Sequence, residues 1–126
     1  MNPLRAAIAT ATAVALLGGC NVGGYISIGP DDDPPSVSLA ASPATASSGE
    51  TIGLVAAASD DYRVVEVVFY RVGASANTFL GRDSSAPYAL ETAMPAGASG
   101  EVRYIAHAID DAGQVGESQS VAVAVR

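Results

Sequence analysis

The chain is poor in the residue types that most often carry chemistry. Its 126 residues include one cysteine, one histidine and no tryptophan. A single cysteine cannot close an intramolecular disulfide, and one cysteine with one histidine falls short of the four ligands of a structural zinc site. A folded domain in this chain therefore depends on hydrophobic packing rather than on disulfides or zinc.

Positive charge is also scarce. Thirteen Asp and Glu stand against six basic residues, all arginine, which gives a formal net charge of −7. Every acidic residue follows position 20 and Arg5 precedes it, so residues 20–126 hold thirteen acidic residues and five arginines, a net charge of −8. Proteins that bind nucleic acid or anionic lipid surfaces need basic patches. We expect no nucleic-acid partner.

The first nineteen residues have the layout of a secretory signal. Arg5 supplies the positive start, Ala6–Leu17 is an apolar run broken only by two threonines, and Gly18-Gly19 provides a small-residue cleavage site. The run is shorter than the roughly 20 apolar residues that a membrane-spanning helix needs. Residues 1–19 are therefore predicted to be a cleaved signal peptide.

Leu17-Gly18-Gly19-Cys20 resembles the lipobox of bacterial lipoproteins, a Leu-x-Gly-Cys motif. The resemblance implies that the Cys20 sulfur receives a diacylglyceryl group, that cleavage falls between Gly19 and Cys20, and that a fatty acid such as palmitate acylates the new amino group. Two or more acyl chains anchor a protein stably, whereas one holds it only reversibly. The alternatives are a plain secreted protein and an N-terminal transmembrane anchor.

A linker is expected to follow the modified cysteine over residues 20–35. Glycines and prolines interrupt it, three aspartates repel one another, and Pro34-Pro35 favours an extended course. In lipoproteins of the enterobacterial pattern, an Asp directly after the modified cysteine retains the protein in the inner membrane. This chain has Asn21 there. The resemblance therefore implies a lipid-anchored protein of the cell envelope that is sorted to the outer membrane.

Residues 36–126 alternate with a period of two between turn residues, which is typical of strands. Val, Thr, Gly and Pro recur where helix formers would be needed, and these residues disfavour helices. The spacing favours an all-β sandwich of about seven strands. The predicted strands are Ser36–Ala40, Thr51–Ala58, Val64–Val72, Thr78–Arg82, Tyr88–Met94, Glu101–Asp110 and Ser118–Val125.

The alternation also assigns faces to the two longest strands. Val65, Val67 and Phe69 are expected to face the core together, and His107 is expected to face outward. Four apolar residues also fall on outward positions and predict an exposed apolar stripe suited to a partner: Val68, Tyr70, Ile105 and Ile109.

The region from Pro35 to the end resembles the bacterial immunoglobulin-like domains. The residues that carry the resemblance are Ser42-Pro43, Gly49-Glu50, Leu54, Ala56, Asp60, Val67–Tyr70, Leu80-Gly81, Ala86-Pro87-Tyr88 and Ala106–Gly113. The resemblance implies an immunoglobulin-like sandwich and makes Tyr104 a candidate for a tyrosine corner, in which the hydroxyl bonds upstream backbone. Ala106 stands where antibody domains have their second cysteine.

No catalytic motif accompanies this pattern. The sequence has neither a Gly-x-Ser-x-Gly nucleophile motif nor a glycine-rich phosphate loop, and its aromatic content of 6% is low for an aromatic-lined cleft. We expect no enzyme activity and no cofactor. The leading hypothesis is a lipid-anchored display or interaction module that meets an envelope protein or a glycan. The alternative is a carbohydrate-binding or enzyme-accessory module at the cell surface.

Aspartates gather where strands of the predicted sandwich begin or end. Asp33 precedes the first strand, Asp60 follows the second, and Asp110 ends the sixth. In an immunoglobulin-like sandwich these positions lie at one pole, and clustered carboxylates suit calcium, which takes six to eight oxygen ligands. The pattern raises a calcium site at Asp33, Asp60 and Asp110 as a hypothesis. The alternative is that these aspartates cap turns by accepting backbone N–H bonds.

Overall fold

The computed structural model describes residues 33–126, which form a compact unit of their own beginning at Asp33. Every regular element in this range is a strand, and none of these residues forms a helix long and apolar enough to cross a membrane. The strands are β2 (Ser36–Ser42), β3 (Thr45–Ala46), β4 (Thr51–Ser59), β5 (Val64–Arg71), β6 (Thr78–Asp83), β7 (Tyr88–Ala93), β8 (Glu101–Asp110), β9 (Val115–Glu117) and β10 (Val121–Val125).

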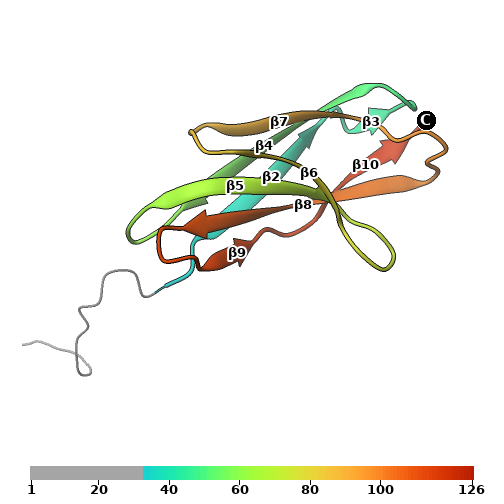
Figure 1. Cartoon of the computed structure of the whole chain (residues 1–126). Helices are drawn as coiled ribbons and strands as arrows, with labels where there is room; N and C mark the ends of the chain where they lie inside the picture. The colour runs from blue at the N-terminus through green and yellow to red at the C-terminus, as the bar shows by residue number, and fades with distance from the viewer. Residues whose placement is uncertain (1–32) are drawn as a thin grey trace, which may run out of the picture. The chain divides into compact units, whose positions relative to one another are not determined.

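The strands form two sheets packed face to face (Figure 1). One sheet has the order β2-β4-β7 and is antiparallel throughout. The other has the order β3-β10-β8-β5-β6, with β9 also paired to β8; within it, only the short β3–β10 pairing is parallel. This is an immunoglobulin-like sandwich, and the predicted fold class is confirmed.

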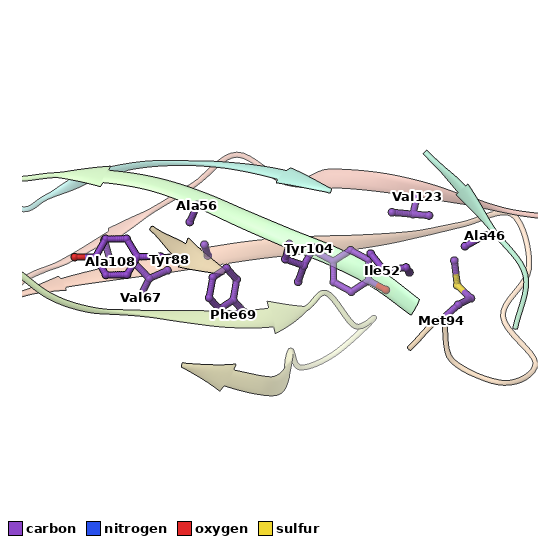
Figure 2. Close-up of a cluster of buried hydrophobic side chains, with 12 residues drawn as sticks. Ala46, Ile52, Ala56, Val67, Phe69, Tyr88, Met94, Tyr104, Ala108 and Val123 are labelled. Carbon is purple, nitrogen blue, oxygen red and sulfur yellow. The ribbon is translucent and has the colours of Figure 1, made fainter. Parts of the chain in front are cut away.

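The core is made by the inward side chains of both sheets. Ile52, Leu54 and Ala56 of β4 alternate with exposed or half-buried neighbours and meet Phe69 and Tyr104 from the other sheet. Figure 2 shows Phe69 near the middle of the cluster and Met94 near one end. Phe69 has no exposed surface, so it fills the centre where antibody domains place a disulfide and a tryptophan.

The predicted inward position of Val65 is wrong. The register of β5 against β8 shifts between Val64 and Glu66, which inserts one extra residue at Val65. Val65 is 37% exposed, and Val64 packs against the core in its place. A strict period of two fails at a bulge because the bulged residue has no partner across the strand pair.

The last predicted strand, Ser118–Val125, begins three residues too early, because β10 covers only Val121–Val125. β9 ends at Glu117, and β10 begins at Val121. Between them the Ser118 hydroxyl accepts the backbone N–H of Ala106 at 2.9 Å, and the Ser118 N–H donates to the Ala106 carbonyl at 2.9 Å. A side-chain oxygen therefore takes a position that a backbone carbonyl would hold in a continuous strand.

Tyr104 is fully buried, as its alternation predicts, but it forms no tyrosine corner. Its hydroxyl finds no hydrogen-bond partner among the residues that the structure describes. Burial raises the pKa of the Tyr104 hydroxyl, and the charge of Arg71 partly opposes that shift. Tyr104 therefore acts through the packing of its ring rather than through a hydrogen bond.

Candidate interaction surface

Aromatic side chains form a row across the outer face of the larger sheet. Phe79 on β6 packs edge-on against Tyr70 on β5, with ring centroids 6.3 Å apart. The Tyr70 ring lies 4.8 Å from the ring of His107 on β8. We call Phe79, Tyr70 and His107 the aromatic row. His107 faces outward, as the alternation predicts, with its side chain 25% exposed.

Charged side chains flank the aromatic row at both ends. The Arg82 guanidinium lies over the Phe79 ring, 5.4 Å from its centroid, and reaches Glu66 at 3.5 Å. At the other end the His107 Nε2 lies 3.2 Å from the Glu117 carboxylate. Each of these charged groups thus has a partner within the sheet surface itself.

The predicted exposed apolar stripe is wrong for its central members. Val68 is only 4% exposed and Ile105 only 5%. Val68 lies between Arg82 and His107 in the strand register, and Ile105 lies beside Tyr70. Long amphipathic and aromatic side chains cover small apolar neighbours on a sheet. The exposed aromatic group on this face is instead Phe79, at 52%.

A groove of about 580 Å³ borders the aromatic row. Its apolar surface comes from Val72 and Ile105, and Ile105 is the cross-strand neighbour of Tyr70. The loop between β5 and β6, which projects from the sheet in Figure 1, contributes Val72 and Asn77. The other lining residues are Arg103, Glu117, Ser118, Gln119 and Ser120.

Arg103 is held in place at the wall of this groove. Its Nε donates to Glu101 at 2.8 Å, and its Nη1 donates to the Ser120 hydroxyl at 2.9 Å. These contacts tie the connection between β9 and β10 to the surface of β8. They also neutralise the only arginine that lines this groove.

The aspartates of the calcium hypothesis each make hydrogen bonds within the fold. Asp110 is 2% exposed, and its Oδ1 accepts the backbone N–H groups of Ala112 at 3.0 Å and Gln114 at 2.7 Å. The turn that these bonds close contains Gly113, whose φ of 85° favours glycine. Asp110 is thus a turn cap at the end of β8.

Asp33 accepts a hydrogen bond from the Gln114 side chain through its main-chain carbonyl. With the Gln114 side-chain amide nitrogen facing its acceptors, it donates to the Asp33 carbonyl at 2.8 Å and to the second Asp110 carboxylate oxygen at 2.9 Å. Close by in the chain, a Cβ at Gly116 would collide with the Pro35 carbonyl. Residues 33–35 are therefore fastened to the turn and strand that follow β8.

Asp60 caps its own turn. Its Oδ2 accepts the backbone N–H groups of Tyr62 and Arg63, each at 3.0 Å, and its Oδ1 has no partner among residues 33–126. Within the same range, no three His, Cys, Asp or Glu side chains form a group that could hold a metal ion. The geometry gives the calcium hypothesis no support. Cys20, the predicted lipidation site, lies outside the described residues.

The contacts of His107 hold its ring on the surface of the larger sheet. His107, the one histidine of the chain, is engaged by Glu117 and the Tyr70 ring, and no serine hydroxyl is paired with it in the described residues. A nucleophile-and-base arrangement requires such a hydrogen bond in a site with oxyanion donors.

Of the residues that line the groove, sequence reasoning placed only Ile105 on a surface suited to a partner. Asn77 and Gln119 were assigned to a turn and to a strand, and they are brought together only by the fold. Phe79 had one available signal, an aromatic side chain next to Leu80 in a short strand, where alternation places the two on opposite faces.

Comparison with known proteins agrees with this architecture. Residues 35–106, more than half of the chain, match the family described as the bacterial Ig domain. The chain therefore belongs to the bacterial Ig domain family, whose members are typically non-catalytic.

A solved structure of similar fold comes from the fibronectin(III)-like modules of Clostridium thermocellum CbhA. It is 26% identical, the match covers 71% of this chain and 93% of that module, and the TM-score is 0.58. No curated protein matches this chain in sequence.

Proposed function

We propose that the chain is a lipid-anchored, non-catalytic interaction module of the bacterial cell envelope. The observation that carries the proposal is the order of its parts. A Leu-Gly-Gly-Cys motif ends an apolar leader, a linker rich in Gly, Pro and Asp follows, and a bacterial Ig domain occupies the rest. An anchor, a spacer and a rigid β-sandwich together make a device for presenting a surface.

The proposed anchor is Cys20, and Asn21 after it favours sorting to the outer membrane. Dual or triple acylation supplies stable attachment, at about 0.8 kcal/mol for each buried CH₂ group. The acidic domain would not add to that attachment, because its surface charge has the same sign as anionic lipids.

The groove and the aromatic row are the surface that this proposal assigns to a partner. They lie on the larger sheet, and Glu117, which lines the groove, directly follows Gly116, against which the Pro35 backbone packs. Loops and faces positioned by a rigid scaffold are common places for binding residues.

Metabolic labelling tests the anchor. Cys20→Ser, expressed in a bacterial host that processes lipoproteins and fed an alkyne fatty acid, should lose the label and accumulate as an uncleaved precursor. Gly18→Ala is the matched control, because it changes the variable position of Leu-x-Gly-Cys and should label normally. Equal labelling of Cys20→Ser would contradict the proposal.

A further inference from the structure

The groove on the outer face offers hydrogen-bonding groups without net charge. Arg103 is neutralised by Glu101 at 2.8 Å, and Glu117 lies 3.2 Å from His107. The two charged side chains that line the groove, Arg103 and Glu117, have opposite signs, and an ionic ligand would compete with the partner that each already has. The groove therefore favours a ligand that carries no charge.

Neutral polar groups remain available at the groove. Gln119 and Asn77 are exposed, and within residues 33–126 their side-chain amide nitrogens have no acceptor, although the Asn77 Oδ1 accepts the Gly73 N–H at 3.4 Å. A primary amide both donates and accepts hydrogen bonds. Such groups match hydroxyls, which also do both.

An apolar surface lies beside these amides. Val72 and Ile105 line the groove, Tyr70 lies across from Ile105, and Phe79 packs against Tyr70 and is 52% exposed. Ligand sites commonly combine aromatic and apolar surface with a few placed polar groups. A pyranose ring has the matching pattern, with C–H groups on its faces and hydroxyls around its rim.

The geometry points to a neutral oligosaccharide as the ligand of this groove. The inference rests on the proposed function in taking the domain to be an interaction module, and it names the partner class. The charge of the chain supports the same choice, because a net charge of −7 repels acidic polymers. The opening between the β5–β6 loop and residues 117–120 would receive the sugar, with Phe79 and Tyr70 at its border.

The test uses the full-length lipoprotein in detergent on an array of neutral, acidic and amino-sugar glycans, followed by calorimetric titration with the neutral glycan that binds best. Binding should be confined to neutral glycans. Loss of one hydrogen bond in Asn77→Ala or Gln119→Ala should weaken it by roughly threefold to tenfold. Loss of ring contact in Phe79→Ala should weaken it by on the order of tenfold.

Tyr62→Ala is the matched control, because Tyr62 is also an exposed aromatic, at 64%, but lies in the turn between β4 and β5 and not in the aromatic row. Its affinity should be unchanged. Cys20→Ser should bind glycans normally even if it loses its lipid, which separates this inference from the proposed anchoring. Binding to no glycan, or binding mainly to acidic glycans, would overturn the inference. So would wild-type affinity in all three variants, Asn77→Ala, Gln119→Ala and Phe79→Ala.

Discussion

Asp110 illustrates how one buried carboxylate can look like a ligand-binding group in the sequence. Its Oδ1 accepts two backbone N–H groups, and its other oxygen faces the Gln114 amide. Each hydrogen bond to a charged group contributes about 1.5–3 kcal/mol. These bonds explain why an aspartate is required at this turn without invoking a cation.

Phe69 is, with Tyr104, one of the fully buried aromatic side chains of the larger sheet, and we predict that Phe69→Ala is strongly destabilising. The side chain has no exposed surface and contacts residues of both sheets. Truncation of a buried Phe costs about 3–5 kcal/mol because it removes apolar contacts and leaves a cavity. Chemical denaturation followed by circular dichroism measures the change.

Glu66→Ala is the control on the same strand. Glu66 faces Arg82, whose side chain is 61% exposed, at 3.5 Å. Exposed ion pairs contribute about 0–1 kcal/mol, so this variant should be nearly silent. A Phe69→Ala variant as stable as Glu66→Ala would contradict the assignment of Phe69 to the centre of the core.

At the scale of elements, the connection between β6 and β7 depends on Asp83. Its two carboxylate oxygens accept the N–H groups of Ala89 at 3.0 Å and Ser85 at 3.1 Å. These bonds, first that from Ala89 and then that from Ser85, lower the pKa of Asp83 below its ordinary value of 3.8. A lowered folded-state pKa stabilises the fold above the unfolded-state pKa, and that stability is lost as the pH falls through the folded-state pKa.

We therefore predict that Asp83→Asn lowers the melting temperature at neutral pH. The gap between the variant and the wild type should narrow as the pH falls below about 3.8, where Asp83 of the wild type also becomes protonated. Thermal melts across this pH range measure the effect. Asp111→Asn, at an exposed position, should match the wild type at neutral pH; a constant gap for Asp83→Asn would refute the linkage.

Alternation predicts long strands well and short ones poorly. All seven predicted strands are present in the sandwich, because five or more alternating residues give a clear period. The two-residue β3 and three-residue β9 have too few residues to show one. The bulge at Val65 and the break at Ser118 depend on partners elsewhere in the chain, Asp110 and Ala106, which no local pattern contains.

The candidate site was less accessible to sequence reasoning than the fold. The outward position of His107 followed from the alternation. The groove did not, because it is lined by Asn77 and residues 117–120, which are far apart in the sequence. The burial of Val68 and Ile105 depends on the length of side chains on neighbouring strands. A sequence pattern assigns a residue to a face but does not tell what covers that face.

At the scale of the whole molecule, the domain has a hydrophobic core formed by both sheets, and residues 33–126 contain no group of three His, Cys, Asp or Glu side chains that could hold a metal ion. We therefore expect the domain to fold on its own. We predict that a fragment of residues 33–126 unfolds in one cooperative transition with a β-type circular dichroism spectrum. A fragment of residues 36–126 should melt several degrees lower, because it loses the Asp33 carbonyl that accepts the Gln114 amide and the Pro35 backbone packed at Gly116. For a domain of this size, 1 kcal/mol corresponds to roughly 4–8 °C.

The 33–126 fragment also allows a test of the calcium hypothesis. A ligand that binds only the folded state raises its melting temperature by mass action, and extracellular calcium modules bind at roughly 10⁻⁴–10⁻³ M. The 33–126 fragment should melt at the same temperature in millimolar calcium and in chelator at matched ionic strength, because one carboxylate oxygen each of Asp60 and Asp110 already caps a turn, and no three His, Cys, Asp or Glu side chains of residues 33–126 form a metal-binding group. Equal melting temperatures of the 33–126 and 36–126 fragments would place the start of the folded unit after Pro35. A calcium-dependent rise in the melting temperature of the 33–126 fragment that disappears in Asp60→Asn/Asp110→Asn would mean that these caps open to bind the ion.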